Sequence, residues 1–147
     1  MKRRAFLPLL PLVFCTRVVA QAPNAHVSTI DPLVRSFTGG KDVLPGKVTL
    51  VLPKIADNGH SVPVTVKVDS PMTSAEHVRA LHLISEKNPV RDMASFYLGP
   101  LVARAEISSR LRLNGSQRVL AIAELSDGSF WSDAVQIEVR EAACTED

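Results

Sequence analysis

The stretch Val62-Pro-Val-Thr-Val-Lys-Val68 alternates valine with other residues over seven positions. Successive side chains of a β-strand point to opposite faces of a sheet, so this period of two predicts a strand with its four valines on the core side. Pro63 has no backbone N–H to donate, and we therefore expect the start of this strand to lie at an edge or a bulge.

Six further segments have the apolar runs or the alternation of short strands. They span residues 48–52, 78–84, 95–98, 103–113, 117–125 and 130–139. Asn114-Gly115 predicts a hairpin between the fourth and fifth of these segments, and Asp127-Gly128 predicts a second hairpin. Seven short strands separated by turns predict an all-β fold, an immunoglobulin-like β-sandwich. A true immunoglobulin domain is not expected, because the chain has no Cys…Trp…Cys core pattern.

One short helix is expected before the strands, in Asp31-Pro-Leu-Val-Arg-Ser-Phe-Thr-Gly-Gly40. An acidic N-cap, a proline at the first helical position and a glycine stop come in the order that helices prefer. Leu33, Val34 and Phe37 give this helix one apolar side.

The first 22 residues are typical of an export signal, which we expect to be removed after Ala20 or Ala22. Three basic residues at positions 2–4 precede an apolar run that is too short to cross a ~30 Å hydrocarbon core, so no membrane anchor is expected. Arg3-Arg4-Ala-Phe-Leu7 has the twin-arginine form, which favours export by that route to the periplasm. Cys15 is a poor acceptor for a lipid, because Phe14 stands where a small side chain is needed.

Without the signal, the charge of the chain changes sign. Four of the 17 Lys and Arg residues lie in residues 1–22, which leaves 13 basic against 15 acidic residues, a net charge of −2. No basic stripe or aromatic stacking platform remains, so nucleic acid is not an expected partner. We expect one sandwich domain over residues 23–140 and a short tail over 141–147.

Motifs for metal or nucleophilic chemistry are missing from the sequence. Its four histidines, His26, His60, His77 and His82, have no metal-ligand spacing, and no metal or other cofactor is expected. Glu124 and Asp127 form a conceivable carboxylate pair, but Leu125-Ser-Asp-Gly-Ser129 is more simply a polar turn.

Two surface features have both a structural and a functional interpretation. If the Asn114-Gly115 hairpin forms, four arginines lie on its adjacent strands. They form either a solvated face or a face that steers anions or docks a partner: Arg104, Arg110, Arg112 and Arg118. Two aromatic pairs, Phe96-Tyr97 and Phe130-Trp131, could anchor an interface. Since neighbouring residues on a strand face opposite ways, about half of these rings should belong to the core.

Cys144 is the remaining candidate for chemistry, because it has no partner cysteine once the signal is removed. Such a cysteine is a free reactive thiol, the site of an intermolecular disulfide, or an incidental tail residue. A thiol on a tail is able to reach into a pocket of another protein.

Three segments resemble the SoxY family of sulfur-carrier subunits in bacterial thiosulfate oxidation. They are Leu52-Pro-Lys-Ile-Ala-Asp-Asn-Gly-His-Ser-Val-Pro-Val-Thr-Val-Lys-Val-Asp-Ser-Pro-Met72, Glu86-Lys-Asn-Pro89 and Ala123-Glu-Leu-Ser-Asp-Gly-Ser129. The resemblance covers about residues 30–140. It implies an immunoglobulin-like sandwich that pairs with a SoxZ-like subunit in the periplasm after twin-arginine export.

The resemblance also implies that this chain is a carrier and not itself an enzyme. In the family, the haem-containing enzyme SoxAX loads thiosulfate onto a cysteine in a C-terminal Gly-Gly-Cys-Gly-Gly arm, which then visits other Sox enzymes. Cys144 matches that cysteine, so it is the expected attachment site of a covalent sulfur adduct. The alternative is a divergent paralogue that keeps the sandwich as a binding or scaffold module, with its carrier function lost or redirected to another substrate.

The tail departs from the family pattern, because Ala142, Ala143, Thr145 and Glu146 replace the four glycines. The thiolate form of a cysteine is the effective nucleophile. A carboxylate about 8 Å away through water raises the free energy of that thiolate by about 0.5 kcal/mol through charge repulsion. The acidic residues 141, 146 and 147 should therefore slow attack a few-fold. Alanines also restrict the backbone and widen an arm that a narrow channel must admit.

Overall fold

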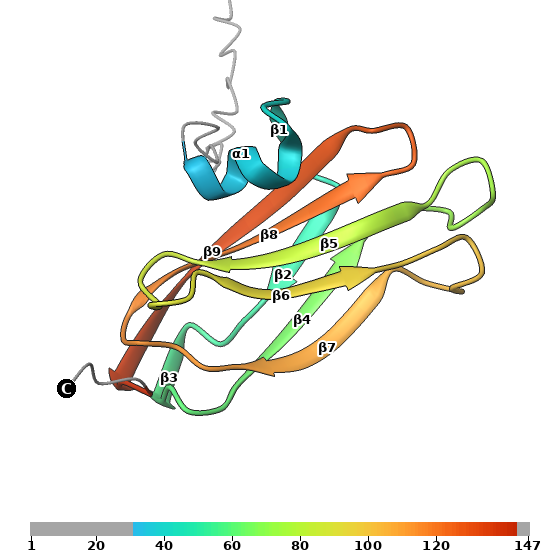
Figure 1. Ribbon diagram of the computed structural model, residues 1–147. Coiled ribbons are helices and arrows are strands. Elements are labelled where there is room, and N and C mark those ends of the chain that lie inside the picture. Colours follow the sequence, from blue (N-terminus) through green and yellow to red (C-terminus); the bar gives the residue numbers. More distant parts are fainter. Residues whose placement is uncertain (1–30, 144–147) are drawn as a thin grey trace, which may run out of the picture.

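The computed structural model describes residues 31–143, so the predicted export signal and Cys144 lie outside the described residues. One helix and nine strands follow one another along this part of the chain (Figure 1). They are α1 (Pro32–Thr38), β1 (Val43–Pro45), β2 (Val48–Val51), β3 (Ile55–Asn58), β4 (Val62–Val68), β5 (Val78–Ser85), β6 (Asp92–Tyr97), β7 (Glu106–Leu111), β8 (Gln117–Leu125) and β9 (Phe130–Glu141).

The strands form two sheets that pack face to face. The larger sheet has the order β1-β9-β8-β5-β6, with β3 also paired to β9, and the smaller sheet has the order β2-β4-β7. Between them lies one apolar core whose fully buried members include Val66, Leu81, Leu83, Val119 and Ile137. The prediction of an all-β, immunoglobulin-like sandwich is confirmed.

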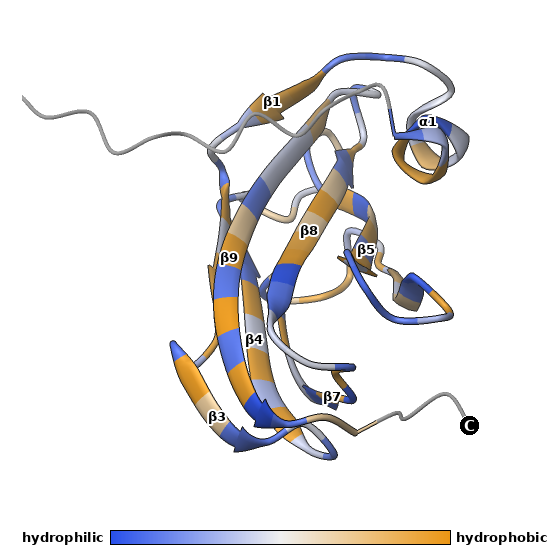
Figure 2. Cartoon of the chain, turned by 90° about the vertical axis from the view of Figure 1, so that its left-hand side faces the viewer, coloured by the Kyte–Doolittle hydropathy of each residue, from blue (hydrophilic) through white to orange (hydrophobic). Residues whose placement is uncertain are grey.

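The alternation that predicted the strand at 62–68 is the burial pattern of β4. All four of its valines are buried, and Pro63 and Lys67 are exposed. Pro63 pairs with Arg110 of β7, whereas the pairing with β2 ends at Thr65, so Pro63 lies where β4 has no neighbour on that side. The expected edge position of the proline is therefore confirmed. Figure 2 shows the same alternation of apolar and polar residues along β9.

One of the two predicted hairpins is correct and the other is wrong. Strands β8 and β9 pair antiparallel around Asp127-Gly128, as expected. The segment before Asn114-Gly115 instead pairs with β4, so this turn carries the chain from the smaller sheet to the larger one. Alternation shows which face of a strand is buried but not which strand lies beside it, and both segments bury one face against the same core.

Two short strands were not predicted, which raises the number from about seven to nine. Both β1 and β3 run parallel to β9 and contact it at opposite ends, Val43 beside Phe130 and Asn58 beside Glu141. Neither has an alternating burial pattern, because each lies at the margin of the sheet. The pairing with β3 reaches Glu141, two residues beyond the predicted end of the last strand.

Helix α1 lies on the outer face of the larger sheet (Figure 1). Its expected caps are present: the Asp31 carboxylate accepts from the Leu33 amide at 3.0 Å, and Gly39 has the left-handed conformation that ends a helix. Val34 packs there against Ile84, Ile122 and Phe130 in a second, smaller apolar cluster. Among the described residues no helix is long and apolar enough to cross a membrane.

Candidate functional site

The last described residues show how the chain approaches Cys144. Strand β9 ends at Glu141, and the backbone at Glu141 and Ala143 is hydrogen-bonded to two other parts of the molecule. Gly59 N–H donates to the Glu141 carbonyl at 2.8 Å, Leu113 N–H donates to the Gly59 carbonyl at 2.9 Å, and Ala143 N–H donates to the Leu113 carbonyl at 3.0 Å. We call Gly59, Leu113, Glu141 and Ala143 the tail clamp.

Position 59 of the clamp requires a glycine, because no larger residue fits there. A methyl group at Gly59 would lie 2.3 Å from the Leu113 carbonyl oxygen and 3.1 Å from the Ala143 amide nitrogen. The glycine is buried, and its neighbour Asn58 closes the turn by accepting from the His60 amide at 2.6 Å. The Asn58-Gly59 turn is part of the long SoxY-like segment, so this segment contains a packing requirement at the base of the tail.

The Leu113 side of the clamp is held by the amide side chains of Asn88, which is half-buried, and Gln117, which is buried. Asn88 donates to the Arg112 carbonyl at 2.8 Å, and its own carbonyl accepts from Asn114 N–H at 2.9 Å and from the Gln117 amide at 3.0 Å. Ser116 both donates to the Val139 carbonyl and accepts from Val139 N–H. Asn88 lies in the second SoxY-like segment, and its bonds fix the loop that carries Leu113.

The four arginines do not form the predicted patch, which is a correction to the sequence interpretation. Arg104 lies in the loop before β7, Arg110 and Arg112 lie in and just after β7, and Arg118 lies on β8 in the other sheet. Since the hairpin that would have joined them does not form, Arg118 lies on another sheet than Arg110. Arg110 instead donates to the hydroxyl of Ser61 at 3.2 Å.

Glu124 and Asp127 do not form a carboxylate pair. Glu124 makes an ion pair with Arg79 at 3.2 Å, and Asp127 accepts from both the amide and the hydroxyl of Ser129. The hydrogen bonds from Ser129 lower the pKa of Asp127. The expected polar turn is therefore confirmed.

The aromatic residues divide as the alternation predicts. Phe130 is buried and Phe96 packs partly buried against the core, while the Tyr97 side chain is 80% exposed on the edge strand β6. Trp131 is half-buried and donates from Nε1 to the Ser129 hydroxyl at 3.0 Å.

His82 is the one described histidine that is buried, at 5% exposure. Its ring stacks on Phe37 of α1 with centroids 4.1 Å apart, and Nδ1 lies 2.8 Å from the Ser95 hydroxyl. Burial lowers the pKa of His82, and the nearby charges of Asp92 and Glu124 oppose that shift. The geometry is that of a neutral core histidine beneath the helix. Within residues 31–143 no three His, Cys, Asp or Glu side chains are placed to hold a metal ion.

We expect the His82 environment to make stability fall as the pH is lowered. The unfolded chain binds the His82 proton more readily than the folded one, so the free energy of unfolding should decrease as pH falls from about 7 to about 5, through the ordinary histidine pKa of about 6.5. His82→Gln should flatten this slope in urea titrations at several pH values, whereas the exposed His60→Gln should keep it. An equal slope in His82→Gln and wild type would contradict this assignment.

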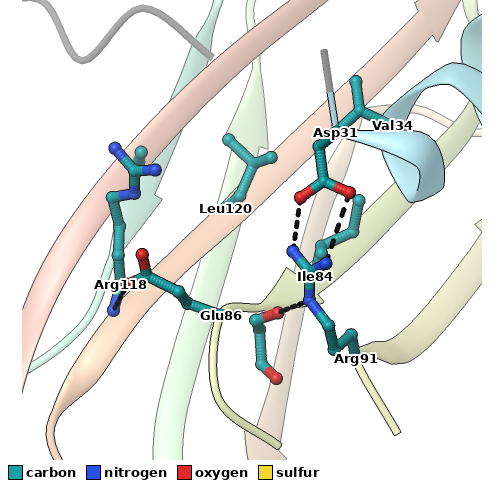
Figure 3. Close-up of a pocket in the computed structure, with 9 residues that line it drawn as sticks. Asp31, Val34, Ile84, Glu86, Arg91, Arg118 and Leu120 are labelled. Atoms are coloured by element: carbon teal, nitrogen blue, oxygen red, sulfur yellow. Dashed lines mark hydrogen bonds and ion pairs between the residues drawn. The ribbon is translucent and has the colours of Figure 1, made fainter. Parts of the chain in front are cut away.

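The cavity beside α1 has a structural role (Figure 3). It measures about 80 Å³ and is lined in part by Asp31, Arg91, Arg118 and Leu120. Arg91 donates to both carboxylate oxygens of Asp31 and, from Nε, to the Ser85 carbonyl at 3.1 Å. The hydrogen bonds from Arg91 lower the pKa of Asp31. These hydrogen bonds of Arg91 tie the helix cap to the turn after β5 at the wall of the cavity.

Comparisons with known proteins agree with this fold. The sulfur carrier protein SoxY from Chlorobium limicola f thiosulfatophilum aligns with a TM-score of 0.64 and 22% identity, over 76% of this chain and 96% of that one. Superoxide reductase (neelaredoxin) from Ignicoccus hospitalis aligns with a TM-score of 0.58 and 18% identity, over 64% and 80% of the two chains. A putative superoxide reductase from Thermotoga maritima aligns with a TM-score of 0.57 and 15% identity, over 71% and 91%.

These identities show a shared fold and no more. A search of curated proteins found no significant match. The model of the family "Sulfur oxidation protein SoxY", however, matches residues 34–144, which include the whole sandwich, the tail clamp and, as the last matched position, Cys144. This chain therefore belongs to the SoxY family.

Proposed function

We propose that this protein is a sulfur carrier that holds a thiosulfate-derived group covalently on Cys144. The observation that supports this most strongly is that the family match continues past the last strand and ends at Cys144. The structural similarity to the sulfur carrier protein SoxY of Chlorobium limicola gives the same fold to a protein of that function. The carrier itself needs no catalytic residue, because separate enzymes perform the redox steps.

The loading step joins two sulfur atoms and releases two electrons. The Cys144 thiol gives its proton to solvent, and the thiolate forms a disulfide bond with the outer sulfur of thiosulfate. The two electrons leave to a haem-containing partner of the SoxAX kind, and the product is a cysteine S-thiosulfonate. Since the thiolate is the reactive form, loading should become faster as pH rises toward the cysteine pKa of about 8.5.

The proposed setting is the periplasm, reached by twin-arginine export. There the sandwich pairs with a SoxZ-like subunit and makes transient contacts with the other Sox enzymes. Twin-arginine export carries folded proteins, which suits a carrier that is assembled with its partner before it crosses the membrane.

An intact-mass measurement tests this proposal. The exported protein, with its SoxZ-like partner and a SoxAX-type enzyme, is incubated with thiosulfate and measured before and after mild reduction. The proposal predicts a gain of one thiosulfate group that reduction removes. An unchanged mass under conditions that load a glycine-arm SoxY would rule out the carrier function.

A second candidate function is a divergent SoxY-family scaffold that no longer carries thiosulfate. The composition of the tail favours it, because alanines and acidic residues replace the arm glycines around Cys144. If this is correct, Cys144→Ser should fully complement a deletion of the gene. A carrier variant without its thiol cannot do so.

A further inference from the structure

We propose that the exposed edge of β6 is a docking site for an extended strand of the SoxZ-like partner, a strand that carries an acidic side chain beside apolar ones. Pairing with such a partner is part of the proposed function, and this inference rests on it for the identity of the occupant. Docking at this edge involves neither thiosulfate nor Cys144, so it is tested separately from sulfur transfer.

The backbone of β6 has a row of groups without a partner. This strand is the last of the larger sheet and pairs only with β5 (Figure 1). Leu98 N–H donates to the Arg79 carbonyl of β5 at 2.9 Å, and residues of an antiparallel strand turn their backbone groups alternately toward the neighbouring strand and away from it. In this register Phe96 faces β5 as Leu98 does, while Ser95 and Tyr97 face outward. Within residues 31–143, the N–H and C=O groups of Ser95 and Tyr97 are therefore open to another strand.

The free edge of β6 has little to prevent association. Free edges are commonly kept short, or they carry lysine or proline. β6 has six residues with neither of these, and its bulge is confined to its start. At the opposite margin of the larger sheet β1 and β3 have only three and four residues, and in β2 the Leu50 N–H is already bound by the Asp133 carboxylate at 2.8 Å. β6 is thus long enough to pair with an added strand and lacks the features that would oppose it.

Exposed apolar side chains gather at both ends of this edge. Among the described residues seven large apolar side chains are exposed, and four of them belong to β6 or flank it: Val90, Tyr97, Leu101 and Val102. When a strand is added to a sheet, backbone hydrogen bonds supply affinity and side-chain contacts supply specificity. The β6 edge offers both kinds of contact in one place.

The charge of the adjoining groove indicates the chemistry of the partner. A groove of about 230 Å³ is lined by Met93 of β6, by Leu111 of β7, and by Arg110 and Arg112. Neither arginine makes an ion pair with another described residue, and Asp92 is the one acidic residue in the lining. A strand added to β6 extends the larger sheet over the edge of β7, so its inward side chains reach this groove. An acidic side chain is complementary to the two arginines there, and an apolar one is complementary to the methionine and the leucine.

Amide hydrogen exchange, measured by NMR, tests the docking site residue by residue. The isotope-labelled mature chain is measured alone and with an excess of the SoxZ-like partner. Alone, the amides of Phe96 and Leu98 should exchange slowly, because they bond to β5, and those of Ser95 and Tyr97 should exchange rapidly. In the complex the exchange of Ser95 and Tyr97 should slow by at least about tenfold, because their N–H groups gain acceptors.

Three results of this measurement would contradict the proposal. The first is unchanged exchange at Ser95 and Tyr97 in a complex that forms. The second is protection in this chain alone that grows with its concentration, which would assign the edge to a second copy. The third is the absence of any complex with the SoxZ-like partner.

Two matched pairs of variants separate docking from a general loss of structure. Tyr97→Lys places a charge on the edge and should weaken partner binding by about tenfold or more, whereas Val51→Lys, at an exposed apolar position of β2, should change it by less than about twofold. Arg112→Glu should weaken binding by about tenfold, and more at low salt, whereas Arg35→Glu makes the same change at an exposed position of α1 and should have little effect. Equal losses within either pair would remove the assigned surface.

Docking and sulfur transfer can fail independently. A chain that protects Ser95 and Tyr97 in the complex but never gains the thiosulfate adduct would refute the carrier function and leave the docking site in place. A chain that gains the adduct while these amides stay unprotected would refute the docking site and leave the carrier function in place.

Discussion

Cys144→Ser is expected to abolish covalent loading, with at least a hundredfold loss of the adduct formed in a fixed time. At the ordinary cysteine pKa of about 8.5, about 3% of a thiol is ionised near pH 7, and this small fraction is enough for attack. A serine hydroxyl is not ionised at this pH, and it has no sulfur with which to form the disulfide bond to thiosulfate. Intact-mass spectrometry of both proteins after the same incubation measures the difference.

The neighbouring residue supplies the control for this variant. Thr145→Ala changes the tail beside the cysteine but leaves the thiol, so it should load at the wild-type rate. Loading of Cys144→Ser at any rate close to wild type would show that the sulfur group is attached elsewhere.

Leu83→Ala is expected to lower the free energy of unfolding by about 2–5 kcal/mol. Leu83 is fully buried on β5, an interior strand of the larger sheet, where its side chain faces the main core. Truncation removes apolar contacts and leaves a cavity that the two packed sheets cannot close without moving apart. Urea titration should show a lower midpoint with an unchanged slope, because the same surface is exposed on unfolding.

Leu101→Ala is the control, because it makes the same substitution at an exposed position. Its side chain is 99% exposed in the loop between β6 and β7, so Leu101→Ala should change stability by no more than about 0.5 kcal/mol. Equal losses in the two variants would contradict the placement of the core between the two sheets.

The faces of the strands could be predicted from the sequence, but not all of their partners. In β4 the alternation assigns each valine to the core, because burial on one face is a local property of a strand. Pairing depends on distant residues, and here the Asn88 and Gln117 amides hold the 112–116 loop as a crossing between sheets. Gly115 has a positive φ, as it would in a hairpin turn. The turn residues alone therefore do not reveal that the chain crosses to the other sheet here.

The candidate site could be predicted only in part. Cys144 is conspicuous as an unpaired cysteine after the last strand, and it stays a prediction, since it lies outside the described residues. The clamp could not be predicted, because it joins three segments that are far apart in the sequence through backbone groups, and these carry no side-chain pattern. The Asn58-Gly59 dipeptide was the one available signal, and in the sequence it indicates only a turn.

The carrier proposal is tested most directly on the peptide that contains the cysteine. Trypsin cleaves after Arg140 and releases residues 141–147, which contain Cys144 and no other cysteine. In protein purified from cells that are oxidising thiosulfate, the proposal predicts this peptide with a sulfur adduct that mild reduction removes. Finding the peptide only with a free thiol during active oxidation would contradict the proposal that Cys144 carries sulfur.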